Sequence, residues 1–264
     1  MSNTIHSTRL GRVISTEEAH EIDDFLGFVQ EYQVIVLRGA SLSISEQMEL
    51  TRRLGVAEQS WEDAHPDCEY LQLMDSRKQK KLTIKSSSKY WHLDRSFMPV
   101  PTRYTLLHAV EIGNGARGTQ FVDSRRLMNS FPPSSTERLR DLSAEHDFAL
   151  RFPEIMGAKG VTEQRISELR KKYPPSIHPL VHQSKFGESL YFNELCVGRV
   201  VGVSDSESAE LVSLMTRSLH DHASIYEHVW QPNDTLIWDN FATIHRARPD
   251  GTQGVRVLHR STAF

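Results

Sequence analysis

Cysteine is scarce in this chain. Cys68 and Cys196 are the only two cysteines among 264 residues, and neither belongs to a Cys-x-x-Cys pair. Two cysteines are too few for the disulfide framework that small secreted proteins use in place of a large core. This scarcity favours a reducing compartment, and we expect the protein in the cytoplasm.

Membrane and nucleic-acid signals are also lacking. No apolar run approaches the ~18 residues of a membrane-spanning helix, and the N-terminus lacks the basic-then-apolar order of a signal peptide. The 31 Lys and Arg stand against 34 Asp and Glu, which gives a formal net charge of −3. Nucleic-acid binding needs a concentrated basic face. We therefore expect neither a membrane nor a nucleic acid among the partners.

The second half of the chain is rich in short strands. Runs of β-branched and aromatic residues alternate there with turn signals, which is typical of a sandwich or barrel. We expect strands at residues 104–110, 119–122, 144–150, 178–181, 189–192, 224–230, 235–238, 243–246 and 255–261. Helices are expected at residues 124–130, 134–142 and 206–222. No linker-like segment divides the chain, so we predict a single domain over residues 1–264, mainly β with flanking helices.

The first half alternates helices with strands. Strands are expected at residues 12–14, 32–37 and 70–74. Ser15 has the chemistry of a helix cap, and apolar residues continue at helical spacing as far as Val29, which predicts one helix. Ser43 or Ser45 begins a second helix, which ends at about Leu54 before Gly55.

Two polar segments are candidate lids. Residues 76–90 contain a basic, serine-rich loop, and residues 151–176 contain three prolines around a charged helical piece. Active-site loops often become ordered over a bound substrate. The alternative for the first segment is an ordinary solvated loop.

The stretch of residues 90–97 carries the chemistry. It offers the imidazole of His92 and the carboxylate of Asp94 two positions apart. In an extended strand these positions point to the same face, so both side chains could hold one metal ion. His245 is the best candidate for a second histidine. A 2-His-1-carboxylate set occupies one face of an octahedral Fe(II) and leaves positions open for a cosubstrate and O₂.

A His-x-Asp pair arises easily by chance among 13 histidines and 34 acidic residues, so its surroundings decide. Arg256 and Arg260 are separated by an even number of positions and would share one face of a strand. A guanidinium binds a carboxylate through two parallel hydrogen bonds, and the hydroxyl of Thr119 could satisfy a further lone pair. This set suits the far carboxylate of a dicarboxylic acid whose 2-oxo-acid end chelates iron.

With these residues in place, the sequence resembles the taurine dioxygenase/TfdA-like family of Fe(II)- and 2-oxoglutarate-dependent dioxygenases. The resemblance extends in order over nearly the whole chain. It is carried by residues 91–97, 101, 107–109, 118–123, 178–181, 230–240 and 245–247, and by Arg256 and Arg260.

The resemblance implies a fold and a set of site residues. The fold would be a double-stranded β-helix, the cupin-like jelly-roll core, with helices packed outside it. His92, Asp94 and His245 would be the iron ligands and the catalytic set. Thr119 and Arg256 would hold the distal carboxylate of 2-oxoglutarate.

The resemblance also suggests substrate contacts. Arg260 matches a position near the anionic group of the substrate, and the alternative is an arginine paired with a core acid. Trp91 is expected as a wall of the pocket. Arg95 and His65 are further candidates, with ordinary surface positions as the alternative.

One departure from the family pattern lies next to Thr119. Residues 116–119 read Ala-Arg-Gly-Thr where the family commonly has Gly-Gly-Asp/Glu-Thr. The turn therefore carries Arg117 and no acid, which alters the hydrogen bonds that it can make.

We therefore expect a dioxygenase that uses Fe(II), 2-oxoglutarate and O₂. It would hydroxylate or desaturate an unactivated C–H bond of a small acidic molecule and release succinate and CO₂. Asp94 favours this over halogenation, because halogenating relatives have a small residue at that position. The alternatives are a non-enzymatic jelly-roll metal-binding protein and a metal-dependent hydrolase, which would need a general base beside the same triad. Family members are often oligomers, so a homo-oligomer is expected.

Overall fold

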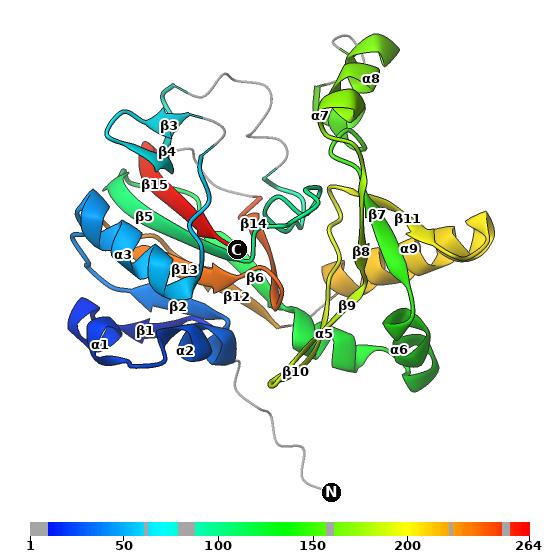
Figure 1. Ribbon diagram of the computed structural model, residues 1–264, viewed down its shortest axis with the longest axis horizontal. Coiled ribbons are helices and arrows are strands. Elements are labelled where there is room, and N and C mark those ends of the chain that lie inside the picture. The colour runs from blue at the N-terminus through cyan, green and yellow to red at the C-terminus, as the bar shows by residue number, and fades with distance from the viewer. Residues whose placement is uncertain (1–9, 61–62, 79–87, 157–160, 222–223, 250–253) are drawn as a thin grey trace, which may run out of the picture.

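The chain folds into several β-sheets with helices on their outer faces (Figure 1). The computed structural model describes residues 10–60, 63–78, 88–156, 161–221, 224–249 and 254–264. None of the described helices is both long and apolar enough to cross a membrane.

The largest sheet has seven strands in the order β1-β2-β13-β5-β15-β4-β3. Their bounds are β1 Arg12–Ile14, β2 Val34–Leu37, β3 Ala64–His65, β4 Cys68–Asp75, β5 Tyr104–Ile112, β13 Thr235–Asp239 and β15 Arg256–Ala263. β1 and β2 run parallel, and the other neighbours run antiparallel. The sequence therefore predicted this sheet's strands well, except for the short β3.

A second sheet supplies the opposite wall of the core. It contains β12 (Ile225–His228), β6 (Thr119–Asp123) and β14 (Thr243–Ala247), in that order and antiparallel. Phe121 of β6 lies in one apolar cluster with Val36, Trp238 and Leu258 of the large sheet. The rings of Phe121 and Trp238 are 5.5 Å apart. These two sheets thus share an inner core between them.

Strand β15 presents alternate residues to the two sides of the large sheet. Leu258 packs in the inner cluster. Ser261, an odd number of positions away, meets the side chains of Gln47 and Thr51 on the outer side. The parity of the strand therefore places Arg256 and Arg260 on one face, which the sequence predicted, and this face is the inner one.

Three helices cover the outer face of the large sheet: α1 (Thr16–Glu21), α2 (Phe25–Tyr32) and α3 (Ile44–Leu54). The prediction of one helix from Ser15 through Val29 was wrong. The helix stops at Ile22 and restarts at Asp24, whose carboxylate accepts a hydrogen bond from the N–H of Gly27 (2.8 Å). Apolar residues before and after this break stay buried in the same cluster, which explains why their spacing looked continuous.

The ends of α3 follow local chemistry. Ser43 is the cap, because its hydroxyl accepts from the N–H of Glu46 while Glu46 accepts from the N–H of Ser43. Gly55 ends the helix with a positive φ of 157°. A Cβ at Gly55 would overlap the carbonyl oxygen of Phe264, so glycine is required by both conformation and space.

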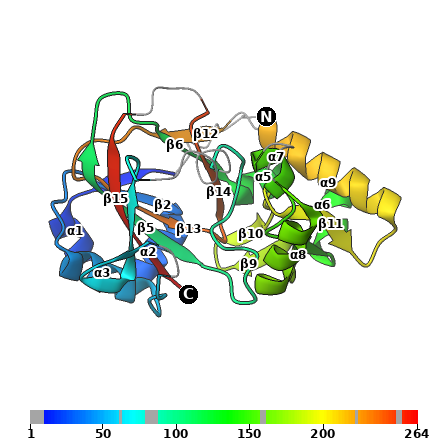
Figure 2. The same ribbon diagram turned by 90° about the horizontal axis from the view of Figure 1, so that it is seen from above.

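The remaining elements lie beyond β14, on the side away from the large sheet (Figures 1 and 2). They form the sheets β11-β7-β8 and β10-β9 with helices around them. Their bounds are α5 Ser124–Ser130, α6 Pro133–Arg140, β7 Ser143–His146, α7 Phe152–Met156, α8 Glu163–Lys172, β8 Ser176–Pro179, β9 Val181–Ser184, β10 Gly187–Leu190, β11 Val197–Val201 and α9 Asp205–His220.

The sequence predicted this part less accurately. The strand expected over residues 144–150 ends at His146, because the carboxylate of Asp147 accepts from the N–H of Ala149 and turns the chain. β11 was not predicted, since Gly198 and Arg199 interrupt its apolar pattern. Residue 222, the last of the helix predicted over 206–222, lies outside the described residues.

Three histidines, two of them buried and one partly buried, make the stability of this part depend on pH. Burial lowers the pKa of His146 to about 3 and of His182 to about 4, and lowers that of His178. In the unfolded chain their pKa returns to about 6.5. Because the folded-state values are depressed, these residues stabilise the fold fully above about pH 6.5, and the contribution is lost as the pH falls toward 4.

We expect the free energy of unfolding to fall by about 1.4 kcal/mol per pH unit for each such proton. Urea unfolding between pH 7.5 and 5 measures this slope. The His182→Phe variant removes one titrating ring where His182 already stacks on Phe241, with centroids 4.4 Å apart. Its slope should be shallower than that of the wild type. Equal slopes would contradict the assignment of a neutral His182.

Candidate active site

The backbone of the His92 stretch differs from the predicted strand. Residues 90–97 contain one isolated antiparallel bridge, between His92 and His245 of β14. The two residues exchange backbone hydrogen bonds of 2.8 Å and 3.0 Å. The chain then turns at Asp94 and Arg95, and Arg95 has a positive φ of 51°. The strand prediction was wrong because side chains hold Asp94, and no described strand pairs with its backbone.

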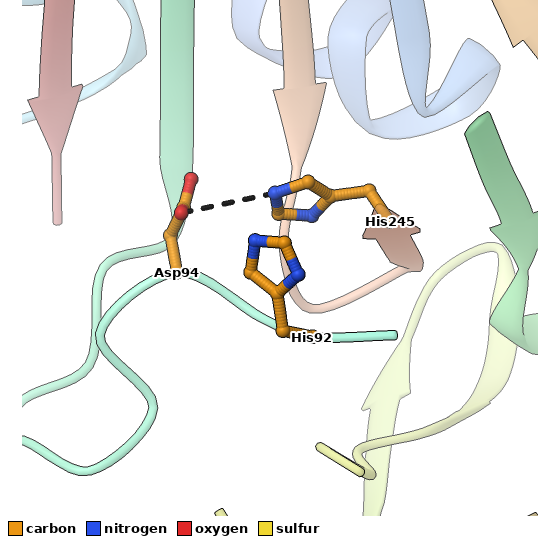
Figure 3. A group of neighbouring side chains, drawn as sticks. All are labelled: His92, Asp94 and His245. Atoms are coloured by element: carbon orange, nitrogen blue, oxygen red, sulfur yellow. Dashed lines mark ion pairs between the residues drawn. The ribbon is translucent and has the colours of Figure 1, made fainter. Parts of the chain in front are cut away.

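The bridge nevertheless brings the three predicted side chains together (Figure 3). Nε2 of His245 lies 3.7 Å from Oδ1 of Asp94, and the rings of His92 and His245 are 4.3 Å apart. One potential ligand atom from each residue lies within 4.8 Å of the others. Among the described residues, no other group of His, Cys, Asp or Glu meets this criterion. A metal with bonds of ~2.1 Å at right angles would need these atoms about 3 Å apart, a small contraction.

The protonation of both histidines suits metal binding. Nδ1 of His92 lies 2.8 Å from the carbonyl oxygen of Tyr90, so this nitrogen donates and Nε2 keeps its lone pair. Burial lowers the pKa of His92, and it lowers the pKa of His245 to about 3. The ring of His245 is stacked on Phe121 at 5.7 Å and meets the edge of Trp238 at 5.0 Å. Both imidazoles are therefore neutral, and His245 is fixed in orientation.

Asp94 is held from three directions. The hydroxyl of Thr105 donates to its Oδ2 (2.6 Å), and Nη2 of Arg260 lies 2.8 Å from its Oδ1. The backbone N–H of Asp94 donates to the side chain of Asn240 (3.2 Å), which itself donates to Thr105 (3.0 Å). Burial alone would raise the pKa of Asp94, but Arg260 and these neighbours bring it below its ordinary value. Asp94 is therefore an oriented carboxylate at neutral pH.

Thr105 and Asn240 were missed as site residues. Thr105 sits in the apolar strand β5, where a threonine carries no functional signal. Asn240 stands in a Trp-Asp-Asn stretch, where an asparagine is typical of a turn. Only the pairing of β5 with β13 brings both beside Asp94.

Replacement of Thr105 by valine should weaken metal binding. The valine cannot donate to Asp94 or accept from Asn240, so the carboxylate loses an orienting partner. Loss of such a supporting contact typically costs about 10- to 100-fold in metal affinity. Anaerobic Fe(II) titrations of Thr105→Val and of the control Thr105→Ser, which keeps the hydroxyl, measure the effect. Equal affinities of the two variants would show that this hydrogen bond has no influence on the site.

The two arginines near Asp94 are both paired with acids. Arg260 contacts Asp94, which agrees with the alternative of a core ion pair, and it also reaches Gln72 (3.4 Å). Arg95 pairs with Glu58 at 2.7 Å, and both side chains are largely buried. Arg95 is therefore not an ordinary surface residue.

Trp91 and His65 both pack against other side chains of the protein. Trp91 is fully buried in the apolar cluster of the smaller sheets, with the guanidinium of Arg246 4.1 Å above its ring. It supports His92 from the core and forms no exposed wall. His65 packs against His259 at 5.0 Å, and His259 alternates with Arg260 on β15 and so faces the outer side. This geometry does not favour His65 as a substrate contact.

Thr119 and Arg256 each begin a strand. The hydroxyl of Thr119 accepts from Nε1 of Trp230 (3.2 Å). The backbone N–H of Arg256 donates to Ser76 (3.0 Å). In the part of the chain that the structure describes, the guanidinium of Arg256 has no ion pair, and burial lowers its pKa. Arg256 is thus a cation without an anion among the residues that the structure describes.

A model of the family described as "Taurine catabolism dioxygenase TauD, TfdA family" matches residues 7–262. The alpha-ketoglutarate-dependent 2,4-dichlorophenoxyacetate dioxygenase of Cupriavidus pinatubonensis is 26% identical over 270 residues, 97% of this chain and 91% of the relative. Pentalenolactone F synthase of Streptomyces arenae is 25% identical, over 89% of this chain and 83% of the relative. The (S)-phenoxypropionate/alpha-ketoglutarate-dioxygenase of Sphingobium herbicidovorans is 24% identical, over 95% and 90%.

Solved structures with the same fold include AAD-2 in complex with Mn(II) and N-oxalylglycine. It superposes with a TM-score of 0.73 at 23% identity, over 95% of this chain and 88% of that one. A taurine dioxygenase from Burkholderia xenovorans gives a TM-score of 0.71 at 18% identity, over 95% and 81%.

Proposed function

Because the chain belongs to the taurine catabolism dioxygenase TauD, TfdA family, we propose that His92, Asp94 and His245 are its iron ligands. The protein is an Fe(II)- and 2-oxoglutarate-dependent dioxygenase that acts on a small organic molecule. The observation that carries the assignment is the convergence of two neutral imidazoles and one charged carboxylate in a buried place. These are the donors that a 2-His-1-carboxylate Fe(II) site requires.

The residues around the triad prepare it for the metal. When bound, Fe(II) and 2-oxoglutarate supply the oxidation of a substrate C–H bond by O₂, coupled to formation of succinate and CO₂. Arg260 and Thr105 keep Asp94 ionised and oriented. Phe121 and Trp238 surround His245 with apolar groups and exclude water from one side of the site.

For the cosubstrate, we propose that Thr119 and Arg256 bind the distal carboxylate of 2-oxoglutarate. The support is the guanidinium of Arg256, which is buried without an ion pair among the described residues. A bidentate carboxylate would neutralise it. We also assign the two facing sheets to the walls of a double-stranded β-helix, or jelly roll, since they share one inner core.

The substrate that we propose is a small carboxylic acid of the aryloxy type. Two of the relatives are named for aryloxy acids, 2,4-dichlorophenoxyacetate and phenoxypropionate. The positive charges of Arg95 and Arg260 lie close enough to repel each other. Glu58 pairs with Arg95, and Asp94 pairs with Arg260. A divalent metal on Asp94 would leave this corner positive and attract an anion.

Residues 151–176 are the better supported lid. Tyr90 donates to Glu154 of α7 (3.3 Å), and the ring of Phe97 meets Tyr173, which directly follows α8, at 5.6 Å. We propose that this segment covers the substrate, because it touches both ends of the stretch that carries His92 and Asp94. The other predicted lid, residues 76–90, lies partly outside the described residues, from 79 to 87. The single domain, the cytoplasmic location and the homo-oligomer stay predictions.

Anaerobic spectroscopy tests the proposed function. Fe(II) and 2-oxoglutarate added to the purified protein should give a weak charge-transfer band near ~500 nm, as expected for a chelated 2-oxo acid on such an iron site. Succinate release with a panel of aryloxy carboxylates then identifies the substrate class. A protein that retains Zn²⁺ and forms no band would instead favour the hydrolase or the metal-binding alternative.

A further inference from the structure

The turn before β6 carries Arg117, a cation near Arg256 that has no role in the function proposed above. Arg117 lies two residues before Thr119. Its turn packs against the start of β15: the N–H of Gly113 donates to the carbonyl of Val255 (2.7 Å). A Cβ at Gly254 would lie 2.9 Å from the backbone nitrogen of Ala116, so these two segments are in close contact. Arg117 and Arg256 are therefore neighbours through their backbones.

The side chains of these two arginines also interact, and unfavourably. Burial lowers the pKa of Arg256, and the positive charge of Arg117 lowers it further. Nε of Arg117 is buried and has no hydrogen-bond partner among the described residues. A guanidinium that is partly removed from water without an anion is costly, and a second cation beside it adds repulsion. Such a pair marks a place where the protein is built to receive negative charge.

The acidic side chain of Glu227, beside this turn, does not supply this charge. Glu227 lies against Gly118, where a Cβ would come within 3.0 Å of its Oε1. This oxygen is paired with Nη1 of Arg248 at 3.2 Å, and the other accepts from Gln120 (2.9 Å). Arg260, on the same face of β15 as Arg256, is neutralised by Asp94. Arg117 and Arg256 thus differ from their neighbours, because neither pairs with a carboxylate among the described residues.

We propose that Arg117 is a second cationic ligand for the distal carboxylate of 2-oxoglutarate, acting beside Arg256 and Thr119. The proposal rests on the function proposed above. A carboxylate offers about four lone-pair sites, which two guanidiniums and one hydroxyl can fill. The consequence is selectivity: the doubly cationic corner favours 2-oxo acids that carry a second carboxylate over those that end in an alkyl chain.

Binding measurements with two cosubstrates test this. The dissociation constant of 2-oxoglutarate on the anaerobic Fe(II) protein is read from the charge-transfer band. Quenching of tryptophan fluorescence gives a second readout, because Trp230 donates to Thr119. We expect Arg117→Ala to raise this constant about 30-fold or more, the usual effect of truncating one member of a buried charge pair, and Arg117→Lys to restore part of the affinity.

The matched ligand is 2-oxovalerate, which has the same 2-oxo-acid end and chain length but no distal carboxylate. Its dissociation constant should be the same for wild type and Arg117→Ala. Arg138→Ala, which removes an exposed cation of α6, should leave both ligands unaffected. Equal weakening of both ligands by Arg117→Ala, or no weakening of either, would overturn the proposal while the function stands. A wild-type protein that forms no band would overturn the function and this inference together.

Discussion

In the variant His92→Ala, the rate of 2-oxoglutarate-dependent succinate release should fall by about 100-fold or more. Replacing even a residue that only supports a metal ligand typically lowers metal affinity or activity by about 10- to 100-fold. The physical reason is the removal of one of three donors from a site that has no fourth candidate among the described His, Cys, Asp and Glu residues. Succinate formation and the iron retained after gel filtration measure the loss.

The fold should survive this change. His92 meets β14 through backbone hydrogen bonds, which alanine keeps. Its imidazole is neutral, so no ion pair is broken. His20→Ala, at an exposed position of α1, is the matched control and should behave as wild type. If His92→Ala retained its iron and its activity, the ligand assignment would be wrong.

The second large effect concerns the cosubstrate. Arg256→Ala should raise the 2-oxoglutarate concentration for half-maximal rate by about 30-fold or more, because the distal carboxylate loses a buried bidentate partner. Arg256→Lys keeps the charge but not the planar fork, so its effect should be intermediate. Initial rates of succinate release over a range of 2-oxoglutarate concentrations measure both variants.

Arg260→Ala provides a contrast on the same strand. It removes the partner of Asp94, so we expect its main effect on metal affinity and only a small effect on the 2-oxoglutarate requirement. If both arginine variants changed the 2-oxoglutarate requirement equally, Arg256 would have no special role in binding the distal carboxylate.

Local chemistry explains what the sequence could predict of the fold. The capping box of Ser43 and Glu46 and the stop at Gly55 define α3 from neighbouring residues alone. The break between α1 and α2 and the short β7 depend on single aspartates, Asp24 and Asp147, that look like ordinary polar residues in the sequence. The apolar pattern indicates which face is buried but not where one helix ends.

For the site, too, the sequence could predict some residues and not others. The ligand types of the triad could be predicted because metal chemistry limits which residues can serve. Their support could not, since Thr105 and Asn240 reach Asp94 only after β5 and β13 pair. The ion pair of Arg95 with Glu58 joins residues far apart in the chain and carries no sequence signal.

The bridge between His92 and His245 bears on how long a metal would remain bound. Two reciprocal backbone hydrogen bonds connect His92 to the strand β14, and one further bond runs from the N–H of Ala247 to the carbonyl of Ser88 (2.7 Å). No regular ladder forms there among the described residues. Such a connection can open locally without unfolding either sheet. The residence time of the iron would then follow the opening rate of these few backbone hydrogen bonds. Hydrogen exchange at the backbone amides of His92 and His245 would measure this opening rate, and slower exchange would accompany slower metal release.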